Sequence, residues 1–253
     1  IAVLMFVAAV INAFIPIMAL IIGLIKMSGA NFSISLLSML QMFLDPGIIP
    51  TLLIAIAILS VLVSIIAGLL LPGFLMAVDN GLADGSQKRG LFSEGIKRFF
   101  TRYFLMTFET SLLTVVAVVF LIISAVPAIV VTRAAFTEKP DLMLAALFID
   151  IITVGVLFLS TTFFRVYVYM WYIAALKGER RAFAAGKAVA DRKFWNLAAG
   201  LLAFDVVFAV LIYIIYLSES QVLRYVSGWL FTTAFFTTLA VYLVETYRKG
   251  TGE

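Results

Sequence analysis

Two charged residues, Arg165 and Asp205, lie deep inside long apolar runs of the sequence. A charged side chain is costly in such a setting, so these residues are candidates for function by default. As helices, the runs place Arg165 12 residues before Lys177 and Asp205 10 residues after Trp195, about 18 Å and about 15 Å from the same end. We expect the two side chains to face the interior and pair. The pair could fix helix register or belong to a transport or lipid-headgroup site.

Glu109 is the third candidate for a buried polar residue. It lies five residues into the apolar run that begins at Phe104, which is about 8 Å deep at the helical rise of 1.5 Å per residue. At that depth, we expect its carboxylate to reach basic residues at the end of the run, such as Arg102.

The residue types that catalysis requires are scarce. The chain has no Cys and no His, which removes thiolate nucleophiles, the usual general base and the commonest transition-metal ligand. A Ser–His pair of the rhomboid type and an HExxH metalloprotease motif are therefore absent. The Asp residues are scattered along the chain instead of grouped around a metal. We therefore predict no enzymatic activity, no cofactor and no metal site.

Two segments combine basic and aromatic residues, and they align at a constant offset of 91: FSEGIKRFFTRYF at 92–104 and FAAGKAVADRKFW at 183–195. The alignment places Phe92 on Phe183 and Gly95 on Gly186, so both segments carry an aromatic residue and, three positions later, a glycine. One interpretation is a membrane-surface helix that positions its neighbours. The other is a docking surface for a cytoplasmic partner such as an ATPase, as in the coupling helices of transport permeases.

The elements that position these residues are long apolar runs. The chain is 64% hydrophobic and 13% charged, whereas a soluble domain is about half apolar and about a quarter charged. Six runs exceed the roughly 20 residues that a spanning helix needs. They cover residues 1–25, 48–78, 104–131, 142–176, 195–217 and 222–244. We predict an all-α, polytopic membrane protein with a single transmembrane domain over residues 1–253, with Pro72-Gly73 as a kink or break in the second span.

Basic residues lie mostly on one side of these spans, which predicts the orientation. The opposite side holds only Lys26, Arg133, Lys139 and Arg224. The richer side holds Lys88, Arg89, Lys97, Arg98, Arg102, Lys177, Arg180, Arg181, Lys187, Arg192, Lys193, Arg248 and Lys249. We therefore predict that these segments and both termini are cytoplasmic and that the protein lies in the cytoplasmic (inner) membrane. Because this bias already explains the net charge of +4, we expect no nucleic-acid partner.

The sequence also indicates an internal duplication. MFLDPGII at 42–49 resembles LFIDIITV at 147–154, which places Asp45 opposite Asp150. Together with the two basic segments, this match makes the second and third spans equivalent to the fourth and fifth. The repeat halves are about 31–131 and 136–217. Because the copies are displaced by two spans, they share one orientation and form a parallel repeat.

The run WYIAALKGERRAFAAGKAVADRKFWNLAAGLL at 171–202 and the ending VYLVETYRKG at 241–250 resemble a superfamily of six-helix prokaryotic membrane proteins. It includes the YciC-like proteins and the membrane domain appended to some glycerophosphoryl diester phosphodiesterases. The resemblance implies a six-helix, duplicated fold. It implies no activity, because the phosphodiesterase chemistry of the fused members belongs to a separate soluble domain.

These observations predict a non-enzymatic membrane component of a transport or envelope-lipid system. Its expected partners are membrane lipid and, for the docking interpretation, a cytoplasmic protein. The alternative is a structural or chaperone-like scaffold for another membrane protein. A transporter should have an interior cavity that Arg165 and Asp205 reach. A scaffold should have a dry core and an exposed groove of apolar side chains.

Overall fold

The computed structural model describes residues 46, 49–84, 89–137, 139–218 and 220–252. Within these residues every regular element is helical: α3 (Ile49–Asp84), α4 (Leu91–Thr137), the short 3-10 helix η1 (Pro140–Leu142), α5 (Met143–Leu176), α6 (Ala182–Tyr216) and α7 (Gln221–Thr251). The all-α prediction is confirmed for this part of the chain. The first predicted span, residues 1–25, and the start of the first repeat half lie outside the described residues.

Five of the described helices are long and apolar enough to cross a membrane. The length of α5, 34 residues, corresponds to about 51 Å at the helical rise, which exceeds the hydrocarbon core of about 30 Å. These helices indicate a multi-pass membrane protein, as the composition predicts.

Local sequence accounts for several of the helix ends. Gly178, two residues after the last residue of α5, has φ +76°, a left-handed conformation that glycine adopts at little cost where a helix stops. Pro140 opens η1, where a missing N–H is tolerated. Ser220 caps α7, because its hydroxyl accepts the backbone N–H of Leu223 at 3.4 Å.

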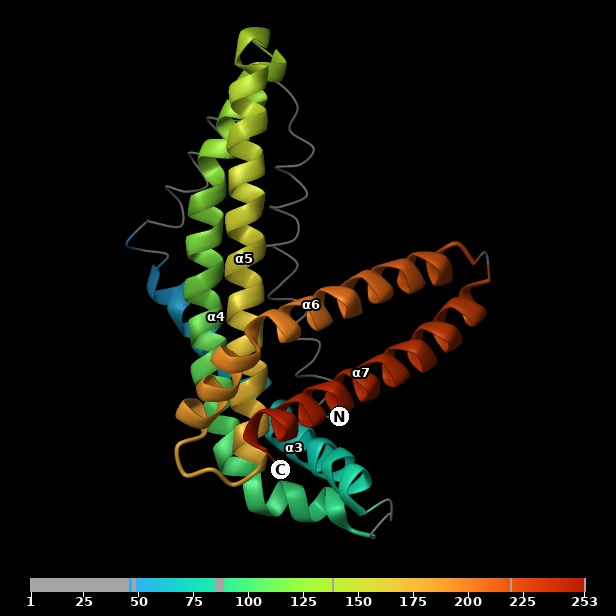
Figure 1. Cartoon of the computed structure of the whole chain (residues 1–253). Helices are drawn as coiled ribbons and strands as arrows, with labels where there is room; N and C mark the ends of the chain where they lie inside the picture. The colour runs from blue at the N-terminus through green and yellow to red at the C-terminus, as the bar shows by residue number, and fades with distance from the viewer. Residues whose placement is uncertain (1–45, 47–48, 85–88, 138, 219, 253) are drawn as a thin grey trace.

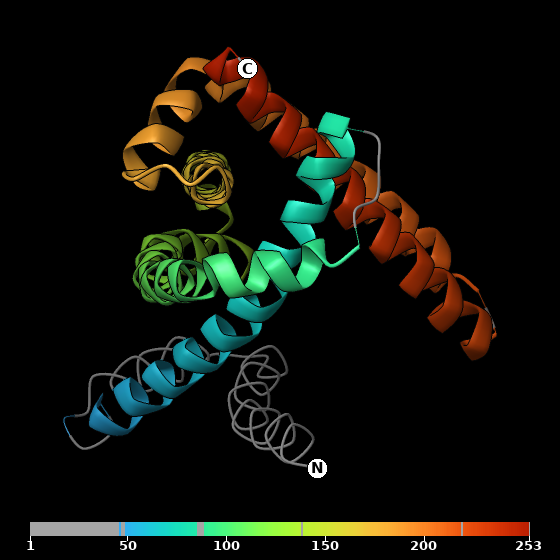
Figure 2. The same ribbon diagram turned by 90° about the horizontal axis from the view of Figure 1, so that it is seen from below.

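The helices form two hairpins that meet at one end (Figure 1). α4 and α5 run side by side and are joined through η1, whereas α6 and α7 form a second hairpin that diverges from the first. Seen from below, α4 and α5 are viewed end-on while the α6–α7 hairpin points away from them (Figure 2). We call the common end the base: α3, α5 and α7 end there, and α4 and α6 begin there.

The buried core of the described residues lies at the base. The parts of the two hairpins that extend away from the base, which we call the arms, have exposed apolar side chains on their surface. Tyr103, Val166 and Leu197 are fully buried at the base. Farther along the arms, large apolar residues such as Val116 and Ile152 are mostly exposed. This distribution is that of helices whose outer surface contacts lipid and whose packing is concentrated at one end.

The two basic aromatic segments are helical and continuous with the spans that follow them. We had expected separate cytoplasmic segments before spans at 104–131 and 195–217. α4 begins at Leu91 and contains its basic segment, and that segment has no Pro to stop the helix. α6 begins at Ala182, but its helical conformation is interrupted at Lys193, next to the predicted start of the span at Trp195. Each helix nevertheless changes direction: α4 bends after its first turns (Figure 1), and α6 has a kink at Lys193, with φ −118° and ψ 17°.

Of the kink or break expected at Pro72-Gly73, the break is absent, whereas α3 changes direction along its length in Figure 2, as a kink would make it do. Pro72 lies inside α3, which continues without interruption to Asp84. Pro72 is fully buried, and packing of this kind can offset the hydrogen bond that an internal proline removes.

Candidate functional site

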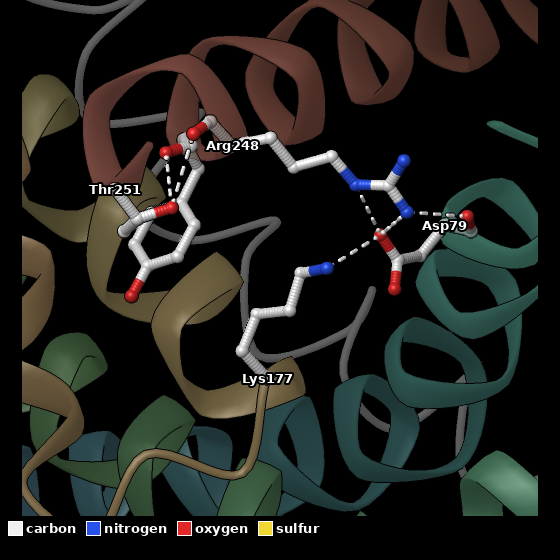
Figure 3. A network of polar contacts seen from close by, with 5 residues as sticks. Asp79, Lys177, Arg248 and Thr251 are labelled. Carbon is white, nitrogen blue, oxygen red and sulfur yellow. Dashed lines mark hydrogen bonds and ion pairs between the residues drawn. The ribbon is translucent and has the colours of Figure 1, made fainter. Parts of the chain in front are cut away.

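Three charged side chains from three helices meet at the base (Figure 3). Arg248 of α7 donates from Nε and Nη2 to Oδ1 of Asp79 at 3.1 and 2.6 Å. Its Nη2 also donates to the backbone oxygen of Asp79 at 2.8 Å. Lys177 Nζ, directly after α5, lies 3.1 Å from the same Oδ1. All three side chains are mostly buried, so this cluster ties the ends of α3, α5 and α7 together and carries a net charge of +1.

An apolar groove of about 490 Å³ lies on the same three helices, and we call it the base groove. α3 contributes Leu70 and Phe74, α5 contributes Tyr169 and Ile173, and α7 contributes Phe236 and Leu243. The hydroxyl groups of Tyr169 and Tyr172 are the polar groups among its lining side chains. A groove of this size and polarity suits a hydrocarbon chain and offers no acid or base for catalysis.

The charged cluster lies beyond the base end of the base groove. α3, α5 and α7 all run toward the base (Figure 1), and a residue four positions further along a helix lies one turn beyond on nearly the same face. Asp79 and Lys177 lie one such turn beyond the lining residues Leu75 and Ile173, and Arg248 joins them through its contact with Asp79. The groove is therefore lined by apolar side chains, with two cations and one carboxylate about one turn beyond its base end.

The two predicted glycines both mark close helix crossings. A Cβ added to Gly95 would lie 2.7 Å from the backbone oxygen of Pro72 in α3, and one added to Gly186 would lie 2.7 Å from that of Met170 in α5. In both cases the obstacle is the backbone of the preceding helix, which cannot move aside easily. The glycines therefore seat the starts of α4 and α6 on α3 and α5.

The aromatic residues that precede these glycines lie against the same crossings. Phe92 covers Gly73, whose added Cβ would lie 2.7 Å from its ring. Phe183 packs edge-on against Trp171, with ring centroids 5.2 Å apart. Both rings remain about half exposed.

The basic residues of the two segments have different surroundings. Arg102 Nη1 donates to the backbone oxygen of Ala175 at 3.1 Å, and Arg98 lies 5.1 Å from the ring centroid of Phe99. Lys187 pairs with Asp191 at 2.7 Å within α6. Lys97 and Arg192 are exposed, Lys193 is at the α6 kink, and Trp195 is 75% exposed. The structure therefore spreads these predicted residues along two helix starts instead of joining them in one site.

Arg165 and Asp205 form the predicted pair. Arg165 Nη1 donates to Oδ2 of Asp205 at 2.6 Å, and its Nη2 donates to Oδ1 at 2.9 Å. The expected interior position is only partly met, because the two side chains are 29% and 46% exposed. Neither residue lines the base groove. The bidentate geometry joins α5 to α6 and satisfies both charges.

Glu109 lines a second groove, of about 390 Å³, which we call the arginine groove. Its other polar lining residues are Arg102, Arg180 and Arg181, and its walls include Trp171 and Phe183. Glu109 lines this groove together with Arg102, as its predicted reach requires. Glu109 is exposed, however, so the prediction that it is a buried polar residue is wrong.

Sequence reasoning did not single out two polar features of the base. The first is the cluster of Asp79, Lys177 and Arg248. Tyr103 and Tyr172 form the second feature: Tyr103 donates to the backbone oxygen of Tyr172 at 2.8 Å, and the Tyr172 hydroxyl donates to Thr107 at 2.7 Å. In both cases the sequence showed a polar side chain within or at the end of an apolar helix. The sequence could not show which helices pack against each other there.

Among the described residues, no group of three or more His, Cys, Asp or Glu could hold a metal ion. No family model, no curated protein and no solved structure matches the chain. The site must therefore be interpreted from its own geometry.

Proposed function

We propose that this chain is a non-enzymatic membrane protein that holds a phospholipid at its base, as a component of a transport or envelope-lipid system. The observation that carries the proposal is the base groove, which is apolar and lies between three helices whose ends, about one turn further on, carry a charged cluster of net charge +1. A hydrocarbon chain would lie along Phe74 and Ile173. The lipid phosphate would lie near Lys177 and Arg248, which attract an anion.

The proposed orientation places the base at the cytoplasmic face of the inner membrane. The basic residues of the α4 and α6 starts, together with Lys177 and Arg248, gather at this end, as the positive-inside rule requires. With a first span within residues 1–25, the chain has six spans, and both termini are cytoplasmic.

We further propose that α3–α4 and α5–α6 are copies of one duplicated unit. Support comes from Gly95 and Gly186, which lie 91 positions apart and meet the backbone of the preceding helix at the same 2.7 Å. The same duplication is what the resemblance to the YciC-like proteins implies. In this proposal α3 and α5 are the equivalent first helices of the two copies, and α7 packs against both of them.

The experiment that tests lipid holding compares two neighbouring leucines of α3. Leu69 and Leu70 are both exposed, but only Leu70 lines the base groove. Leu70→Trp should fill the groove, whereas Leu69→Trp adds the same bulk elsewhere on the helix. Native mass spectrometry of protein purified in mild detergent should detect a retained phospholipid on the wild type and on Leu69→Trp. It should detect markedly less on Leu70→Trp.

Equal retention on the two tryptophan variants would contradict the proposal, because the lipid would then lie outside the base groove. Absence of any retained lipid on a folded wild-type protein would contradict it as well. Circular dichroism and a thermal unfolding scan in the same detergent establish that both variants are folded.

A partner-docking or scaffold role is the second candidate. It is supported by exposed side chains on the two helix starts, including Trp195, Lys97 and Arg192. Crosslinking in cells from Lys97, Lys187 and Lys193 tests it. A stoichiometric cytoplasmic ATPase would make the chain a permease subunit, whereas a membrane protein partner would support the scaffold.

A transport site built on Arg165 and Asp205 has less support, because neither residue lines the base groove or the arginine groove.

A further inference from the structure

The arginine groove lies at the base between α4, the end of α5 and the start of α6. Three arginines line it, Arg102, Arg180 and Arg181, and Glu109 is the only acidic residue among the lining side chains. The lining therefore carries a net charge of +2. Three arginines around one groove give an apolar ligand no additional stabilisation, whereas they can form ion pairs and hydrogen bonds with a phosphate group.

The arginines differ in how firmly they are held. Arg102 is partly buried, and its Nη1 donates to the backbone oxygen of Ala175, which fixes the guanidinium beside the end of α5. That bond uses one of five N–H donors. Arg180 and Arg181 are exposed in the connection between α5 and α6. One anchored arginine and two exposed arginines are suited to receiving an anion from solvent or from the membrane surface.

The remaining lining gives the groove a polar end and an apolar end. Leu105 and Met106 lie one turn of α4 beyond Arg102, and Trp171 lies on the side of the groove formed by α5. Trp171 is six residues before Lys177, about 9 Å deeper along the helix. The cations are thus nearer the end of the bundle, and the apolar and aromatic wall extends from them along the spans. This is the polarity of a phospholipid, with the headgroup at the interface and the acyl chain beneath it.

The arginine groove is separate from the base groove. Trp171 lines the arginine groove, whereas Tyr169 and Ile173 line the base groove. Residues two positions apart in a helix point about 200° away from each other, so Tyr169 and Ile173 face away from Trp171. Tyr172, which also lines the base groove, is turned by about 100° from Trp171. The two grooves therefore use different sides of α5. The inference drawn from the arginine groove therefore does not rest on the function proposed for the base groove.

We infer that the arginine groove binds the phosphate of an anionic phospholipid, with Arg102, Arg180 and Arg181 around the phosphate and the first acyl carbons against Leu105 and Trp171. A zwitterionic lipid is a poorer ligand, because its cationic headgroup would face the same arginines. The groove is thus a selectivity site for anionic lipid at the base of the protein.

The test measures single-lipid binding to the full chain in a neutral detergent by native mass spectrometry, with phosphatidylglycerol and phosphatidylcholine as probes. The variant Arg180→Gln/Arg181→Gln removes two lining cations from an exposed connection. The matched control, Lys97→Gln/Arg192→Gln, removes two exposed cations that do not line the groove. We expect the wild type and the control to prefer phosphatidylglycerol. The groove variant should lose that preference by about thirtyfold, which corresponds to about 1 kcal/mol for each of the two basic residues.

Three results would overturn the inference. An equal loss in the control variant would assign the preference to surface charge in general. An unchanged preference in the groove variant would place the headgroup elsewhere. Displacement of phosphatidylglycerol by the same concentration of glycerol 1-phosphate would show a free phosphate site instead of a lipid site. Leu70→Trp serves as a further check, because it should leave this preference intact even if the base groove holds no lipid.

Discussion

Arg248 and Asp79 are 169 residues apart in sequence, yet the Nη2 of Arg248 lies 2.6 Å from Oδ1 of Asp79 and 2.8 Å from its backbone oxygen. This contact holds the end of α7 against the end of α3, and Lys177 adds α5 to the same carboxylate. One acidic side chain therefore connects the ends of three helices.

Replacing Asp79 with Asn should destabilise the protein, because Lys177 and Arg248, both mostly buried, would lose the carboxylate that they share. We expect a loss of about 2 kcal/mol or more in the free energy of unfolding, measured by denaturant titration in detergent. Lys249→Gln is the matched control, since it breaks an exposed pair with Glu245 in the same helix and should cost less than about 0.5 kcal/mol. Similar losses in the two variants would show that the Asp79 cluster has no special role.

The glycine crossings make a second prediction. Gly95→Ala and Gly186→Ala should each lower stability by about 1–3 kcal/mol, because the added methyl group meets helix backbone that cannot yield without moving the helix. Gly81→Ala is the control: nothing lies within 4 Å of its added Cβ, and alanine should favour the helix there. Thermal unfolding of the three variants tests this order. Unchanged stability of Gly95→Ala and Gly186→Ala would exclude close packing at both positions.

The Arg165–Asp205 pair should behave as a structural unit. Arg165→Leu leaves Asp205 charged inside the membrane, and we expect a loss of about 2–3 kcal/mol. The double variant Arg165→Leu/Asp205→Leu should recover most of that loss, because it removes both charges together. A double-variant cycle on unfolding free energies measures the coupling. If the double variant folds normally but loses lipid binding or partner binding, the pair is a functional site and the structural interpretation is wrong.

The class of protein and one specific contact could be predicted from the sequence. Long apolar runs predicted spanning helices because each run alone determines whether it can cross a bilayer. Arg165 and Asp205 could be paired because they lie on consecutive helices at similar depths, so the short connection alone brings them together. The resemblance to the YciC-like proteins, the sixth span and the duplication stay predictions.

The grooves and the Asp79 cluster could not be predicted in the same way. Asp79, Lys177 and Arg248 come from three helices that are far apart in sequence, and no local pattern specifies which helix ends meet. The kink of α6 at Lys193 lies next to the predicted start of the span at Trp195, but the start of α4 was missed for a different reason. A rise in polarity was interpreted as the end of a span, but a helix continues through a membrane surface when no proline or turn residue stops it.

The most direct test of lipid holding is photo-crosslinking with a phospholipid that carries a diazirine in its acyl chain, followed by mapping of the labelled residues. With the protein in lipid nanodiscs, the account predicts label concentrated on Leu70, Phe74 and Phe236 of the base groove and lost from these positions in Leu70→Trp. Label spread over the exposed arms, including Val116, Phe120 and Ile152, in proportion to their exposure and unaffected by Leu70→Trp, would contradict it.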